Sequence, residues 1–267
     1  MKAEQAKKLS NEALERLSRS LADGKSEALT EYLKAVAMFH DYSFGNIMLI
    51  AAQRPDATQV AGFQTWKKLG RFVRKGEKGI AIIAPMVFRK DDSGGGDGEG
   101  DMTLRFRAVH VFDVSQTDGD ALPEPATVQG DPGPFTARLE SFVAKRGIKL
   151  TEAEDLGGAD GLSKGGTIVL RTELSPAKHF SVLVHETAHE LLHHTGDRPS
   201  SKVVRETESG AVAFVVGEAV GLQNGSAAAD YIQLYDGNTA TLAASLDRIQ
   251  KTAAEIIAAI TTDEAQS

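Results

Sequence analysis

The chain of 267 residues contains no cysteine. Disulfide bonds, cysteine zinc sites and thiol nucleophiles are therefore excluded, so any metal must be held by His, Asp or Glu. No apolar run approaches the ~20 residues that a membrane span needs. The polar start, MKAEQAKKLSNEALERL, predicts an amphipathic helix rather than a signal peptide. We therefore expect a cytoplasmic protein with no membrane partner.

The net charge of −7 is unevenly distributed along the chain. Residues 1–90 carry 16 Lys and Arg against 9 Asp and Glu, a net charge of +7, which leaves −14 for residues 91–267. Such a split favours two modules, the first with an anionic partner. Chance surface charge is the alternative explanation.

Proline is scarce, but four of the 8 prolines lie in ALPEPATVQGDPGP, residues 121–134. This composition predicts a linker between a domain over 1–120 and a domain over 135–267. The fold class that we predict is α+β. A small domain of helices and a β-hairpin comes first, followed by a mainly helical domain with a short sheet.

In the first domain, apolar residues recur at helical spacing, while the later segments are strand-like, and 103–114 has alternating faces. Helices are predicted over 4–22, 25–40 and 43–53, with a short one in 62–70. Strands are predicted over 78–88 and 103–114, joined by the acidic, glycine-rich loop 91–101.

In the second domain, Ser175 and Pro176 are a favourable N-cap and first residue for a helix that should end at Gly196. A short strand centred on 167–170 precedes it. Further helices are predicted over 135–146, 203–222 and 239–261.

The stretch HETAHELLHH, residues 185–194, contains the H-E-x-x-H pattern. On a helix, His185 and His189 share a face and can bind one ion. Glu186 beside them can take a proton from the water that a catalytic zinc activates. His193 continues this face and is either a further ligand or a residue at the helix C-terminus, where the helix dipole favours it. A polar helix that is merely rich in histidine is the alternative.

A catalytic zinc needs a third protein ligand, and Leu192 and Thr195 occupy the places where one known arrangement has Gly and His. A glutamate from the next helix is the remaining source. Glu208 shares the apolar face of that helix, where an unpaired carboxylate is costly unless it binds a metal. We therefore prefer Glu208 over Glu206 as the third ligand, and a solvated Glu208 near the helix start is the alternative. Mn²⁺ is an alternative to Zn²⁺ in a site of His and Glu.

The chemistry of such a site is peptide hydrolysis with Glu186 as general base. The strand at 167–170 could pair with an extended peptide substrate. Tyr231 or Tyr235 could donate a hydrogen bond to the oxyanion, with Tyr231 preferred, although a packing role is the alternative for both.

The stretch WKKLGRFVRKGEKG, residues 66–79, is strongly basic. Cations that neutralise phosphates, interleaved with aromatics on which bases stack, are typical of single-strand binding. A solvated cationic face over core aromatics is the alternative. The candidate DNA contacts are Trp66, Lys67, Lys68, Arg71, Arg74, Lys75 and Lys78, with Phe63 and Phe72 interleaved.

Residues 42–85, YSFGNIMLIAAQRPDATQVAGFQTWKKLGRFVRKGEKGIAIIAP, together with FRAVHVFDVSQT, resemble the N-terminal domain of ArdC-type antirestriction proteins. The resemblance implies a single-stranded-DNA-binding domain over about 25–117. The second half resembles the ImmA/IrrE-type, gluzincin-like zinc metallopeptidase domain, in which HETAH is followed by a helix with a ligand glutamate. This implies ligands at His185, His189 and Glu208 and a base at Glu186. Gly210 stands where many relatives have a second Glu.

Three hypotheses follow. In the first, the chain binds single-stranded DNA, carries a zinc peptidase domain and protects incoming mobile-element DNA from restriction. In the second, it is a regulatory protease that cleaves a repressor, with the basic half as a docking surface. In the third, the metal is structural and the function is DNA binding alone.

Overall fold

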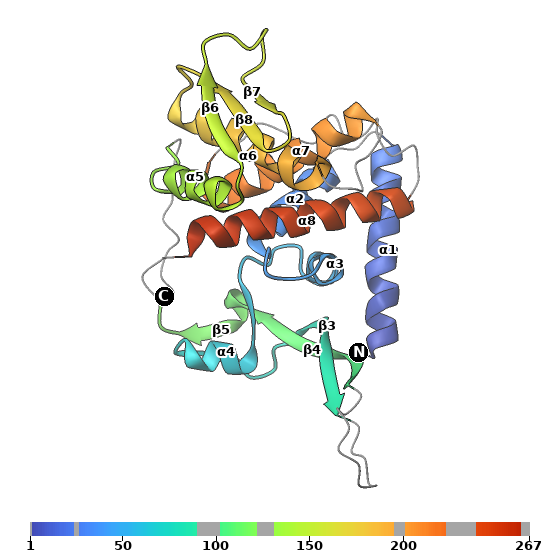
Figure 1. Ribbon diagram of the computed structural model, residues 1–267. Coiled ribbons are helices and arrows are strands. Elements are labelled where there is room, and N and C mark those ends of the chain that lie inside the picture. The colour runs from blue at the N-terminus through green and yellow to red at the C-terminus, as the bar shows by residue number, and fades with distance from the viewer. Residues whose placement is uncertain are drawn as a thin grey trace, which may run out of the picture. The chain divides into compact units, whose positions relative to one another are not determined.

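The computed structural model describes residues 2–23, 27–89, 102–121, 131–194, 201–222 and 239–262. Helices and several small sheets make up an α+β fold, as predicted (Figure 1). The chain divides into two compact units, Met1–Leu14 with Gly45–Leu122 and Glu15–Phe44 with Pro123–Ser267. Residues 15–44 thus cluster with the second unit, although they belong to the predicted first domain. The division falls within α1 (Ala3–Ala22).

The first unit contains a three-stranded antiparallel sheet in the order β1-β4-β3. Its main part is the hairpin of β3 (Ile80–Arg89) and β4 (Met102–Asp113), which runs in register from Ile80 opposite Val111 to Arg89 opposite Met102. The predicted strands therefore pair as expected, while the loop 91–101 lies outside the described residues. β1 (Val60–Gly62) pairs with the other edge of β4.

Helix α3 (Phe44–Gln53) closes the outer edge of β3 with two side-chain amides. Asn46 donates to the Ile83 carbonyl and accepts from its amide, at 2.9 and 2.8 Å. Gln53 does the same with Ala81, at 2.8 and 3.0 Å. An open strand edge offers unpaired backbone groups to other chains, so these two side chains supply the pairing that a further strand would give.

A second, two-stranded sheet pairs β2 (Arg71–Val73) with β5 (Thr117–Gly119). β2 follows the short helix α4 (Phe63–Lys68), and β5 follows the 3₁₀ turn η1 (Val114–Gln116). Asp113 caps this turn: its buried carboxylate accepts from the amides of Thr58, Gln59 and Ser115. Burial raises the pKa of Asp113, but these hydrogen bonds outweigh it, so the pKa is lowered.

The second unit has a three-stranded sheet in the order β6-β8-β7. β6 (Lys149–Ala153) is parallel to β8 (Thr167–Arg171), and β7 (Gly161–Ser163) is antiparallel to it. β8 is the predicted strand, but both of its edges are paired. The expectation that this strand pairs with an extended substrate is therefore wrong, and among the described strands β7 presents the edge next to α6.

Helices fill the rest of the second unit. α6 (Pro176–His193) packs against β7, β8 and α7 (Lys202–Ala219), and α7 packs against α2 (Glu27–Met38) and α8 (Thr239–Thr261). α5 (Phe135–Lys145) lies against α8 and β6. Aliphatic side chains of these helices form the core, among them Leu183, Val212, Val215, Leu246 and Ile256.

The predicted helix boundaries agree closely with these elements, except that α6 ends at His193 instead of Gly196, which lies outside the described residues. Ser175 is the N-cap of α6 with extended backbone, but its side chain makes no capping hydrogen bond. None of the described helices combines the length and the apolarity that a membrane crossing takes.

Candidate functional site

Helix α6 presents His185 and His189 side by side because four residues make about one helical turn. The opposite face of the helix packs in the core, where Phe180, Leu183 and Val184 are fully buried. The core therefore fixes the direction in which both imidazoles point.

Helix α7 adds a carboxylate to the two imidazoles. The Nε2 atoms of His185 and His189 lie 3.1 Å apart, and Oε2 of Glu206 lies 3.4 Å from each of them. A tetrahedral ion with bonds of about 2.0–2.1 Å separates its ligand atoms by about 3.3–3.4 Å. The three atoms therefore fit one small cation. Within the part of the chain that the structure describes, this is the one triad of potential metal ligands that converges in this way.

The protonation states of His189 and Glu206 suit a cation. Burial lowers the pKa of His189 to about 4, and the neighbouring His185 acts in the same direction. Hydrogen bonding to His185 lowers the pKa of Glu206 to about 2. Near neutral pH, His189 is neutral and Glu206 is ionised, so that each has an electron pair to offer.

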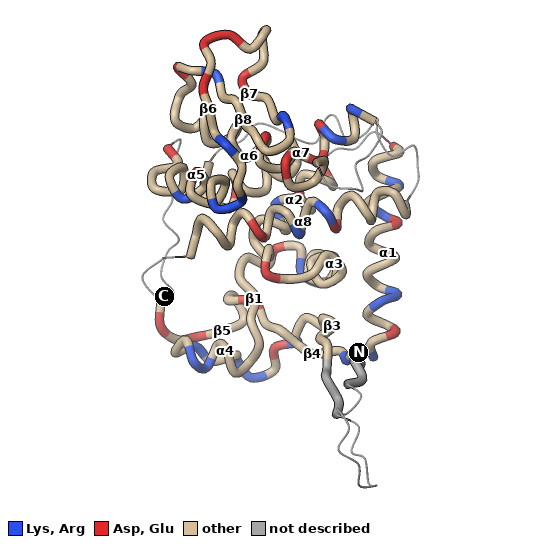
Figure 2. Tube along the Cα trace, in the orientation of Figure 1, with Lys and Arg blue, Asp and Glu red and all other residues tan. Residues whose placement is uncertain are grey.

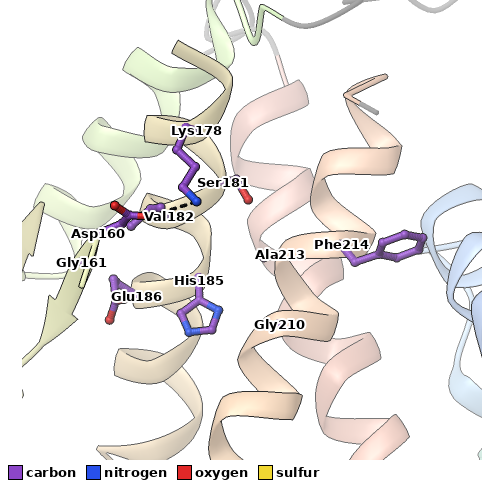
Figure 3. A pocket seen from close by; sticks show the side chains of 10 residues that line it. All are labelled: Asp160, Gly161, Lys178, Ser181, Val182, His185, Glu186, Gly210, Ala213 and Phe214. Carbon is purple, nitrogen blue, oxygen red and sulfur yellow. Dashed lines mark ion pairs between the residues drawn. The ribbon is translucent and has the colours of Figure 1, made fainter. Parts of the chain in front are cut away.

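Glu186 lines a cavity of about 390 Å³ together with His185 (Figure 3). Burial raises the pKa of this carboxyl group to about 7, against the opposing effect of His185, and the carboxylates of Glu206 and Glu190 raise it further. A hydrogen bond from the amide of Ser163 acts in the opposite direction. A carboxyl group with a pKa near neutrality can accept and release a proton near pH 7.

The walls of this cavity come from both sides of α6. Gly161 of β7 and the Asp160–Lys178 ion pair, at 2.9 Å, lie on one side, while Gly210 and Ala213 of α7 lie on the other. Small side chains on α7 leave room beside His185 of the triad and Glu186. The cavity therefore lies directly beside the triad.

Glu208, the predicted third ligand, is not part of the triad. Its fully buried carboxylate accepts hydrogen bonds from His193 at 3.0 Å, from Ser245 at 2.6 Å and from Arg248. The prediction is corrected accordingly. A buried carboxylate does need a partner, but here the partner is the guanidinium of α8, and the glutamate that faces the histidines is the half-exposed Glu206.

A sequence signal for Glu206 did exist. Glu206, Gly210 and Ala213 recur at helical spacing, so the small residues that line the cavity share a face with the carboxylate. Tyr231 and Tyr235, the proposed oxyanion donors, lie outside the described residues.

In the first unit, two of the basic residues serve the fold. Arg71 donates to Thr117 and to the carbonyls of Gly119 and Asp120, and so holds β2 against β5. Arg74 pairs with Glu77 at 2.9 Å and with Asp118 at 3.3 Å.

Trp66 is 2 % exposed, and its indole N–H donates to the Phe112 carbonyl at 2.8 Å. It cannot stack on a base, so its assignment as a DNA contact is wrong, and its large apolar ring is part of the core instead. Phe63 and Phe72 of the same stretch are 50 % and 58 % exposed. The lysines of this stretch are exposed as well, and α4 carries two of them in its last turn (Figure 2): Lys67, Lys68, Lys75 and Lys78.

Comparison with known proteins finds a family match for the N-terminal part of the chain. Residues 5–112 match the model for the N-terminal domain of the anti-restriction factor ArdC. An uncharacterized protein of Bacillus anthracis is 24% identical over 278 residues, covering 86% of this chain and 47% of the relative. The chain thus spans about half the length of that relative.

Two crystal structures of the antirestriction protein ArdC from plasmid R388 share the fold. The metal-free structure is 18% identical, with a TM-score of 0.58, and covers 94% of this chain and 96% of that one. The Mn(II)-bound structure is 19% identical, with a TM-score of 0.56 and the same coverage.

Proposed function

We propose that this chain protects incoming mobile-element DNA from restriction, because its residues 5–112 match the N-terminal domain of ArdC and its fold is similar to that of an ArdC protein. The R388 protein, whose structure it resembles, is an antirestriction protein. In this proposal the first unit binds single-stranded DNA, and the second unit is a metal-dependent peptidase.

The observation that carries the enzymatic half is the convergence of His185, His189 and Glu206 from two helices. Nitrogen and oxygen donors without sulfur suit both Zn²⁺ and Mn²⁺. Zinc is the proposed ion, and Mn²⁺, which the R388 protein binds in its crystal structure, is the alternative. Such an ion, when bound, polarises a peptide carbonyl and lowers the pKa of water.

Glu186 is the proposed general base. It follows His185 directly on α6 and lies at the wall of the cavity, where burial keeps its pKa near neutrality. From this place its carboxylate takes a proton from the attacking water and returns it to the leaving amine.

The proposed substrate is a peptide in extended conformation. β7 carries Gly161 at the cavity wall and pairs through one edge with β8. An extended peptide can add to the other edge of β7, with backbone hydrogen bonds for affinity. One of its side chains then enters the space between Val182 and the small residues Gly210 and Ala213.

The DNA half of the proposal rests on exposed lysines next to exposed phenylalanines. Lys67 and Lys68 lie on α4 between Phe63 and Phe72 in the sequence, and all four side chains are exposed. Ammonium groups neutralise phosphates, and a base stacked on an aromatic ring contributes about 1–3 kcal/mol. This combination favours single strands, whose bases are free to stack.

Transformation tests the two halves together. A plasmid with restriction sites enters a restricting host that expresses the wild-type chain, Glu186→Gln or the triple variant Lys67→Ala, Lys68→Ala, Phe72→Ala. We expect protection by the wild type and its loss in both variants, with both variants folded. A wild-type chain that gives no protection would contradict the antirestriction proposal. Protection that survives in Glu186→Gln would show that the second unit does not act as a peptidase in this role.

A further inference from the structure

The stretch HETAHELLHH contains the H-E-x-x-H pattern twice, because His189 ends one copy and begins the next. The structure uses the second glutamate differently from the first. Glu190 accepts hydrogen bonds from the Ser163 hydroxyl at 2.7 Å and from the amides of Gly165 and Gly166 at 2.9 and 2.7 Å. It therefore fastens the β7–β8 turn to α6 and does not face the cavity as a base.

The second histidine of this copy, His193, is 1 % exposed and lies between His189 and Glu208. Its Nδ1 is 3.0 Å from Nδ1 of His189, and its Nε2 is 3.0 Å from Oε2 of Glu208. The three side chains thus form a continuous path from a triad member to the buried carboxylate.

One placement of protons satisfies every contact on this path while both imidazoles stay neutral. Nε2 of His189 faces His185 and Glu206 and needs its lone pair to bind a cation. The proton of His189 then sits on Nδ1 and is donated to Nδ1 of His193. The proton of His193 sits on Nε2 and is donated to Glu208.

From this path we infer that His193 is a positioning residue, which fixes the tautomer and ring orientation of His189, and that Glu208 fixes His193. The inference rests on the proposed metal site at His185, His189 and Glu206. Carboxylates or carbonyls that hold the second nitrogen of a ligand histidine tune metal affinity, and their loss weakens binding by about 10–100-fold. Here an additional imidazole lies between the ligand and the carboxylate.

Helix α8 contributes no described residue to the lining of the cavity. The path nevertheless connects α8 to the triad. Ser245 and Arg248, both on α8, donate hydrogen bonds to the other oxygen of Glu208, Oε1. The position of α8 is therefore linked to the orientation of His189 through two buried side chains.

Three variants of the full chain separate positioning from packing. His193→Leu fills a similar space but can neither accept from His189 nor donate to Glu208. His193→Gln keeps an acceptor and a donor, so it should restore both bonds. Glu208→Gln keeps an acceptor for His193 but removes the charge. Thermal unfolding in the presence of a chelator shows whether each variant folds without metal.

The first measurement is the dissociation constant for Mn²⁺, obtained by calorimetric titration of each folded, metal-free protein. We expect His193→Leu to weaken binding about 10–100-fold, His193→Gln to recover most of the loss and Glu208→Gln to fall between them. Equal Mn²⁺ affinity in the wild type and His193→Leu would overturn the inference while leaving the metal site in place.

The second measurement is the ring-nitrogen NMR spectrum of the metal-free wild type, which reports the tautomers directly. Protons on Nδ1 of His189 and on Nε2 of His193 support the path, and the reverse placement overturns it. This readout holds even if the wild type binds no metal, an outcome that would defeat the proposed function separately.

Discussion

Gly161 leaves the space that Glu186 occupies: a β-carbon on Gly161 would lie 2.9 Å from Cγ of Glu186 and 2.6 Å from a methyl group of Val182. Real β-carbons do not approach other atoms so closely, so Gly161→Ala must displace the proposed base. We expect peptide hydrolysis to fall about tenfold or more, since a catalytic base misplaced by about 1 Å costs on the order of 10²-fold. The metal ligands are untouched, so metal content measured on the same sample should equal that of the wild type.

Gly210 on α7 provides the matched control on the opposite wall of the cavity. A β-carbon there meets nothing within 4 Å. Alanine in a helix interior is favoured over glycine by about 0.5–1 kcal/mol, so we expect Gly210→Ala to unfold at a slightly higher temperature than the wild type. A destabilised Gly210→Ala, measured by calorimetry, would contradict the open space at this wall.

The capping carboxylate of Asp113 should make the stability of the first unit depend on pH. Its pKa is lowered in the folded state, so its contribution is present above the unfolded value of about 3.9 and is lost as pH falls through the folded value. We expect Asp113→Asn to cost about 2 kcal/mol at pH 7, and the difference from the wild type to shrink below about pH 4. Urea unfolding followed by the fluorescence of Trp66, the single tryptophan, reports this unit. A difference that does not change with pH would contradict the role of the charge.

The exposed lysines and the paired arginines of residues 67–78 should behave differently in DNA binding. For single strands, each phosphate contact contributes about 0.7 to the slope of log K against log salt. We expect Lys67→Ala with Lys68→Ala to flatten this slope by up to about 1.4, in fluorescence titrations of an oligonucleotide over a salt series. Arg71→Ala should chiefly lower the unfolding temperature, because Arg71 holds β2 against β5. An unchanged slope in the double lysine variant would remove these side chains from the DNA surface.

The long helices and the hairpin could be predicted from the sequence because periodic apolar residues decide them locally. The segment 78–88 is a short apolar run and the segment 103–114 alternates in polarity, and they pair in the structure as β3 and β4. The short strands β6 and β7 were missed, because β7 has only three residues and β6, KLTEA, lacks the apolar run that marks β8. Their pairing with β8 depends on contacts that are distant in sequence.

The third member of the triad could not be read from polarity alone. Glu208 lies on the buried face, and burial of a charge was taken as the sign of a metal. Whether a buried carboxylate meets a cation of the protein or a metal depends on the next helix, and here Arg248 of α8 supplies the charge. The prediction of Trp66 as a DNA contact was wrong for a related reason. An aromatic ring in a basic stretch faces either a ligand or the core, and tertiary packing decides which.

Anomalous X-ray diffraction from crystals of the full chain grown with Zn²⁺ tests the central claim most directly. The account predicts one strong zinc peak per chain, bonded to the Nε2 atoms of His185 and His189 and to the carboxylate of Glu206. A peak bonded to His193 and Glu208, or no peak in a crystal that shows the triad ordered, would contradict it.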